Sequence, residues 1–142
     1  MKLKIFLITT LIPLLVFFMG CSSSKSDGGD GGDTVKPNPS FANDIQPIFS
    51  SGCALSNCHN SGSTRAGLNL TQGQAYANLV NVNSTEVPGL MRVLPSDADN
   101  SYIVIKLEGR QTVGGRMPLS GSITNTQLQN IKNWINNGAQ NN

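Results

Sequence analysis

Two cysteines and the only histidine of this 142-residue chain lie within seven residues, from Cys53 to His59. Any fold of this sequence must therefore hold two thiols and an imidazole at one place. A structural zinc site is excluded, because it needs four Cys or His ligands and this segment has three. A thioredoxin-type redox site is excluded as well, because its C-x-x-C spacing is absent. A disulfide between Cys53 and Cys58 is one interpretation that stays open.

The N-terminus has the features of an export signal. Two lysines precede an apolar run from Ile5 to Phe18 that is too short to span a bilayer. The run ends in Phe18-Met19-Gly20-Cys21, which resembles the lipobox of bacterial lipoproteins, although Phe18 stands where the family usually has Leu or another aliphatic residue. The resemblance implies a signal peptide at 1–20, cleavage before Cys21, and a diacylglycerol on the Cys21 sulfur. We therefore expect an exported protein, lipid-anchored to a bacterial membrane on its periplasmic or outer-membrane side.

The stretch that follows is too polar to fold by itself. Residues 22–40 are rich in Gly, Ser and Asp and contain one apolar residue, Val35. We expect residues 21–40 to be an acylated cysteine with a flexible linker, and residues 41–142 to be the folded domain. Without the signal, 8 Lys and Arg balance 8 Asp and Glu. Such a neutral chain has no basic surface for nucleic acid, which we exclude as a partner.

Apolar residues at helical spacing predict the main secondary structure. A first helix has Asn43 as its expected cap and Pro47 near its first turn. Its predicted buried face consists of Phe41, Ile45, Ile48 and Phe49. A short helix is expected at about 72–80, with Ala75 and Leu79 inward. The segment 101–107 is ambiguous between helix and strand.

The last helix has the clearest signals. Thr124 and Gln127 have the spacing of a capping box, and Gly138 supplies a stop. Its apolar face consists of Leu128, Ile131, Trp134 and Ile135. We expect Trp134 to pack this helix onto the first one, with a contact from its indole N–H to a cofactor as the less favoured reading.

A two-cysteine motif that ends in Cys-His is the attachment motif of c-type haem. Each thiol adds to one haem vinyl group, and the adjacent histidine then lies under the iron. The usual motif has two residues between the cysteines, whereas this chain has four. The extra two must bulge outward if both sulfurs are to reach the vinyl groups. From the spacing alone, haem attachment and a structural Cys53–Cys58 disulfide are alternatives.

Further motifs follow in a fixed order along the chain. They are Ile45-Gln-Pro47-Ile48-Phe49, Cys58-His59, Gly67-Leu68-Asn69-Leu70, Pro95-Ser-Asp97, Ser101-Tyr-Ile-Val-Ile, Gly114-Gly-Arg-Met117-Pro118 and Ile131-Lys-Asn-Trp134-Ile135-Asn-Asn-Gly138-Ala139. This order resembles the single-haem c-type cytochrome domains of exported bacterial proteins. The resemblance covers most of the chain after the linker.

The resemblance implies a small all-α, cytochrome c-like domain with three main helices and short helices around one haem c. The haem is expected to be attached covalently through Cys53 and Cys58, with His59 as proximal and Met117 as distal iron ligand. Met91 is the alternative distal ligand, because it is the only other methionine after the signal. Arg116 is expected either to pair with a haem propionate or to be a solvated surface residue.

The resemblance also implies a function. We expect an electron carrier rather than an enzyme, with one haem cycling between Fe(II) and Fe(III), redox proteins as partners, and a lipid anchor at Cys21. One alternative is a sensor or binding module in which CO or NO displaces Met117. Another is a haem-free structural lipoprotein with a Cys53–Cys58 disulfide.

Overall fold

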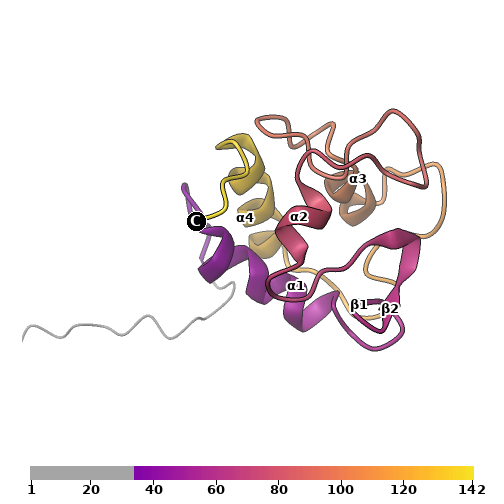
Figure 1. Ribbon diagram of the computed structural model, residues 1–142. Helices are drawn as coiled ribbons and strands as arrows, with labels where there is room; N and C mark the ends of the chain where they lie inside the picture. Colours follow the sequence, from indigo (N-terminus) through magenta and orange to yellow (C-terminus); the bar gives the residue numbers. More distant parts are fainter. Residues whose placement is uncertain (1–33) are drawn as a thin grey trace, which may run out of the picture.

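The computed structural model describes residues 34–142, and Figure 1 shows their arrangement. The elements in chain order are η1 (Phe41–Ile45), α1 (Gln46–Gly52), β1 (His59–Asn60), β2 (Ser63–Thr64), η2 (Arg65–Gly67), α2 (Ala75–Leu79), α3 (Tyr102–Glu108) and α4 (Asn125–Asn136). The expected signal peptide, Cys21 and the linker as far as residue 33 lie outside the described residues. Within the described part, no helix has the length and apolar character needed to cross a membrane.

The expectation of an all-α domain is wrong. Strands β1 and β2 pair as a two-stranded antiparallel sheet, with His59 opposite Thr64, so the described chain is mixed α and β. The hairpin has a local cause, because the Asn60 side-chain oxygen accepts a hydrogen bond from the Gly62 backbone N–H at 3.0 Å. Asparagine favours turns through such bonds. The hairpin is polar throughout and lacks the apolar alternation that identifies a strand in a sequence.

The first helical segment, η1 followed by α1, buries the predicted face. Each of its four apolar residues is at most 5% exposed. The predicted cap at Asn43 is wrong, because the cap is Ser40, whose hydroxyl accepts a hydrogen bond from the Asn43 N–H. The carboxylate of Asp44 reaches back and accepts from the Ser40 N–H at 2.8 Å. Pro47 lies in the first turn of α1, as predicted.

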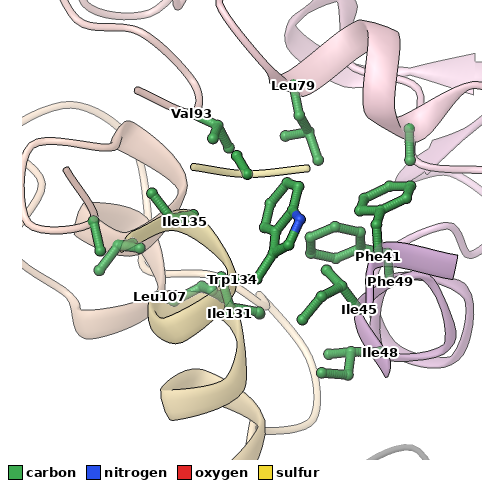
Figure 2. Close-up of a cluster of buried hydrophobic side chains, with 14 of the residues drawn as sticks. Phe41, Ile45, Ile48, Phe49, Leu79, Val93, Leu107, Ile131, Trp134 and Ile135 are labelled. Atoms are coloured by element: carbon green, nitrogen blue, oxygen red, sulfur yellow. The ribbon is translucent and has the colours of Figure 1, made fainter. Parts of the chain in front are cut away.

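Helix α4 has the predicted capping box at Thr124, and Gly138 follows the helix with a φ of +93°, where glycine is favoured. Trp134 packs α4 onto η1, as predicted, with its ring centroid 5.1 Å from that of Phe41. Figure 2 shows the Trp134 indole among the side chains of η1, α1 and α2. The indole N–H donates to the Gln140 carbonyl at 2.9 Å, so the less favoured reading of a cofactor contact is wrong.

The two middle helices carry the remaining core. The ambiguous segment is helical and forms α3. Its start is fixed by Ser101, whose hydroxyl donates to the Asp97 carbonyl at 2.8 Å and accepts from the Leu94 N–H at 2.9 Å. Ala75 and Leu79 of α2 are fully buried, as predicted.

The end of the expected linker lies along α4. Asn130 accepts from the Lys36 N–H at 2.7 Å and donates to the Thr34 carbonyl at 3.0 Å. Asn133 donates to the Lys36 carbonyl, and Asn137 donates to the Pro37 carbonyl, both at 2.7 Å. Asparagine side chains therefore replace apolar burial in holding a polar segment on the domain.

Candidate functional site

A cavity of about 590 Å³ lies among segments that are far apart in the sequence. Cys53, Cys58, His59 and Met117 all line it. Its remaining walls are largely apolar and come from α1, α3 and α4 and the connections between them, with Phe49, Leu68, Leu107 and Ile131 among them. Pockets that take small molecules and cofactors have volumes of roughly 300–1,000 Å³ and apolar walls of this kind. The four residues singled out in the sequence are thus brought together at one ligand-sized site.

The two cysteines lie at the ends of a short loop. Cys53 follows the last turn of α1, where its N–H donates to the Phe49 carbonyl at 2.9 Å. The loop is closed by the His59 N–H, which donates to the Cys53 carbonyl at 3.2 Å. Asn57 has a φ of +65°, a conformation that asparagine adopts more readily than most residues. Leu55, Ser56 and Asn57, between the two half-buried residues Ala54 and Cys58, are exposed to solvent, and Asn57 also lines the cavity.

Both cysteines are free thiols rather than a disulfide. Burial, and then the neighbouring Cys58, raise the pKa of the Cys53 thiol to about 11. Cys53 is therefore a neutral thiol at physiological pH. Both sulfurs remain available to a ligand in the cavity.

The imidazole of His59 is held by the backbone. Its Nδ1 lies 3.3 Å from the Leu68 carbonyl oxygen, which can only accept, so Nδ1 carries the proton and donates. Burial lowers the pKa of the ring, which favours the neutral form. The lone pair is then on Nε2, the arrangement in which a histidine binds a metal while its other nitrogen is fixed by a carbonyl.

Met117 is held at the cavity by backbone contacts with α3. Its N–H donates to the Lys106 carbonyl at 3.0 Å, and its half-buried side chain packs against the hydrophobic core. Gly114, in the loop before Met117, has a φ of +68°, a conformation that glycine adopts without strain. The glycine-rich loop therefore turns without strain just before the residue that lines the cavity.

Two other candidates from the sequence lie elsewhere. Arg116 is exposed and does not line the cavity, and its guanidinium donates to the Leu107 carbonyl at 2.9 Å. The expected propionate contact from Arg116 therefore has no support in the structure. Met91 does not line the cavity either, which leaves Met117 as the methionine at the site.

The sequence analysis missed a group of charged and polar residues on the cavity wall. Glu86 accepts from the Lys106 ammonium at 2.8 Å and from the Tyr102 hydroxyl at 2.9 Å. The Lys106 hydrogen bond holds the pKa of Glu86 below its usual range, while burial and Glu86 raise that of Tyr102 to about 12. Tyr102 and Lys106 are four residues apart in an otherwise apolar run, a spacing that places them on one helix face. That spacing could have identified Tyr102 and Lys106 from the sequence, whereas no sequence pattern marks Glu86 or the buried Arg92.

The residues of the cavity fit a covalently attached haem. Two free thiols, one imidazole with an available Nε2 and one thioether surround an apolar space of suitable size. A porphyrin supplies four nitrogen ligands itself, so the protein needs to provide only axial ligands. Among residues 34–142, no group of three or more His, Cys, Asp or Glu side chains could hold a metal ion directly.

The chain matches no protein-family model, and comparison with curated proteins and with solved structures gave no match either.

Proposed function

We propose that this protein is a membrane-tethered electron carrier of the c-type cytochrome kind, which holds one haem c in the cavity. The observation that supports the proposal is the meeting of four side chains at one apolar site. Cys53, Cys58, the only histidine and one of the two methionines after the signal all line it. Three of the four come from one short segment, but Met117 comes from a loop far along the chain.

Cys53 and Cys58 would hold the haem covalently. Each thiol would add across one vinyl group, with sulfur bonding to one vinyl carbon and hydrogen to the other, so no atom would leave. The solvent-exposed loop between Cys53 and Cys58 leaves room for the two extra residues of the motif. The raised pKa of the Cys53 thiol lowers its thiolate fraction and hence its intrinsic reactivity.

His59 and Met117 line the cavity and would be the two protein ligands of the haem iron. When bound, the haem supplies an iron that accepts and releases one electron. A histidine–methionine pair raises the reduction potential relative to harder ligand sets. If both side chains bind the iron, they would leave it no open coordination position, which would favour electron transfer over oxygen or peroxide chemistry, and we expect no enzymatic activity. The apolar walls favour the less charged, reduced iron.

The lipid on Cys21 would hold this domain at a bacterial membrane, on the periplasmic or outer-membrane side. Residues 22–33 would then serve as the tether, because the asparagines of α4 hold the chain from Thr34 onward. A Gly- and Ser-rich chain of twelve residues has a mean reach of about 20 Å. The domain could therefore turn between redox partner proteins while remaining attached.

Attachment is tested by the intact mass of the mature protein, made in a bacterial host with and without the haem-attachment machinery. We expect a gain of one whole haem only when the machinery is present. The double variant Cys53→Ala/Cys58→Ala should show no gain, while Ser56→Ala, in the exposed loop between them, should load like the wild type. A wild-type mass without haem under both conditions contradicts the proposal and favours the haem-free structural lipoprotein.

A further inference from the structure

Arg92 is a buried charge without an opposite charge beside it. It is 7% exposed and lines the cavity. Its two terminal nitrogens each donate to a backbone carbonyl, of Asn78 and of Ala66, at 2.8 Å. None of the ion pairs within residues 34–142 includes Arg92. A guanidinium has five N–H donors, so three remain for a ligand.

The cavity as a whole carries excess positive charge. Arg65, Arg92 and Lys106 line it, while Glu86 is the one carboxylate among the lining residues. Glu86 is engaged by Lys106, which leaves the two arginines uncompensated at the cavity. Arg65 is exposed and its Nε donates to the Asn57 carbonyl, so it lies at the rim. Arg92 is the interior one. Two uncompensated cations match a ligand with two carboxylates, and a haem carries two propionates.

We propose that Arg92 binds one carboxylate of the ligand in the cavity, which is a haem propionate under the proposed function on which this inference rests. A buried charge is costly unless it is paired, and the propionate supplies the missing partner. The planar guanidinium suits a carboxylate, because it can offer parallel N–H donors. Arg92 also donates to carbonyls of two separate elements, Asn78 in α2 and Ala66 in η2, so it fixes the propionate relative to the protein frame. This role takes the place of the one that the sequence suggested for Arg116.

The pairing predicts how the reduction potential responds to pH. The paired propionate stays ionised, so it does not titrate between about pH 5 and 8. In Arg92→Gln the same propionate is buried without a cation, which raises its pKa into that range. A negative propionate stabilises Fe(III), so the potential of the variant falls as pH rises through that pKa. The other charged or titratable groups of the cavity wall differ in their roles. The pKa of Glu86 is lowered by its hydrogen bond with Lys106, and that of Tyr102 is raised to about 12. Lys106 is paired with Glu86, Arg65 lies at the rim, and Cys53, Cys58 and His59 would be bound to the haem.

The test measures the reduction potential of the haem-loaded full-length protein from pH 5 to 9. At pH 9 we expect the oxidised-to-reduced ratio of Arg92→Gln, at a fixed applied potential, to be at least tenfold higher than that of the wild type. This corresponds to a reduction potential that is lower by about 59 mV for one electron. Its potential should also vary with pH, whereas that of the wild type should not. Arg92→Lys keeps the charge and should show most of the wild-type potential. Arg110→Gln is the matched control, because Arg110 is exposed and pairs with Glu108 outside the cavity, and it should change neither quantity.

Three outcomes overturn the inference, and they separate it from the proposed function. If the haem-loaded Arg92→Gln protein keeps the wild-type potential and pH profile, Arg92 binds backbone carbonyls only. The proposed electron carrier is then unaffected. A wild type that takes up no haem removes both proposals. If Arg92→Gln fails to load, carbon NMR of the reduced wild type with ¹³C-labelled propionates decides. One carboxylate should remain ionised below pH 4, and protonation of both near pH 5 overturns the inference.

Discussion

Replacing Met117 with alanine is expected to open the distal position of the iron. The reduced variant should then bind carbon monoxide readily, whereas the wild type should not. Its reduction potential should fall by on the order of 0.1 V, a fraction of the roughly 0.8 V over which axial ligands set haem potentials. The measurements are the absorption change of the reduced protein on addition of carbon monoxide and a redox titration.

Met91→Ala provides the matched control, because Met91 is the other methionine after the signal and does not line the cavity. It should leave both the potential and the carbon monoxide response unchanged. If Met91→Ala rather than Met117→Ala gives the large effect, the distal ligand has been assigned to the wrong residue. A wild type that binds carbon monoxide as readily as Met117→Ala favours the sensor, in which the methionine is displaced by the ligand.

The haem-free chain is expected to lose most of its cooperative stability. A dry cavity of about 590 Å³ would cost on the order of 14 kcal/mol at about 24 cal/mol per Å³. The cavity opens to solvent, and water will reduce this cost. Even a third of it is comparable with the whole free energy of unfolding of a typical domain, about 5–15 kcal/mol. Without a ligand, the apolar walls therefore have little to hold them apart.

Urea unfolding followed by circular dichroism measures this effect. The double variant Cys53→Ala/Cys58→Ala should unfold at much lower urea than the wild type, or without a cooperative transition. The loaded Ser56→Ala protein should unfold with the wild-type midpoint, because Ser56 is exposed in the same loop. A haem-free protein that unfolds at the wild-type midpoint would mean that the protein core alone sustains the fold.

Local sequence signals predicted the helices that carry their own pattern. The apolar spacing of η1 and α1, the capping box at Thr124 and the packing of Trp134 on Phe41 all follow from short-range rules and are present. The hairpin at His59 escaped prediction because it depends on a polar asparagine turn. The Ser40 cap escaped prediction as well, because Asn43 nearby is also a residue type that is favoured at helix caps. Where two local patterns compete, tertiary contacts decide.

The candidate site divides in a similar way. Cys53, Cys58 and His59 are close in sequence, and Met117 has a glycine-rich loop that marks it, so all four could be named in advance. Arg116 was chosen because it adjoins Met117, but neighbours in a loop point in different directions, and its guanidinium reaches the Leu107 carbonyl instead. Arg92 and Glu86 reach the cavity through long-range folding alone. No residue spacing in the sequence indicates that these two side chains line the cavity.

The most direct test of the central claim is the absorption spectrum of the purified mature protein, made with the haem-attachment machinery and recorded before and after reduction with dithionite. The proposal predicts strong haem absorption that remains with the polypeptide under denaturing conditions. It also predicts a sharp visible band that appears on reduction and is unaffected by carbon monoxide. A protein whose spectrum contains only the absorption of its aromatic residues in both states would contradict the claim that Cys53, Cys58, His59 and Met117 form a haem site.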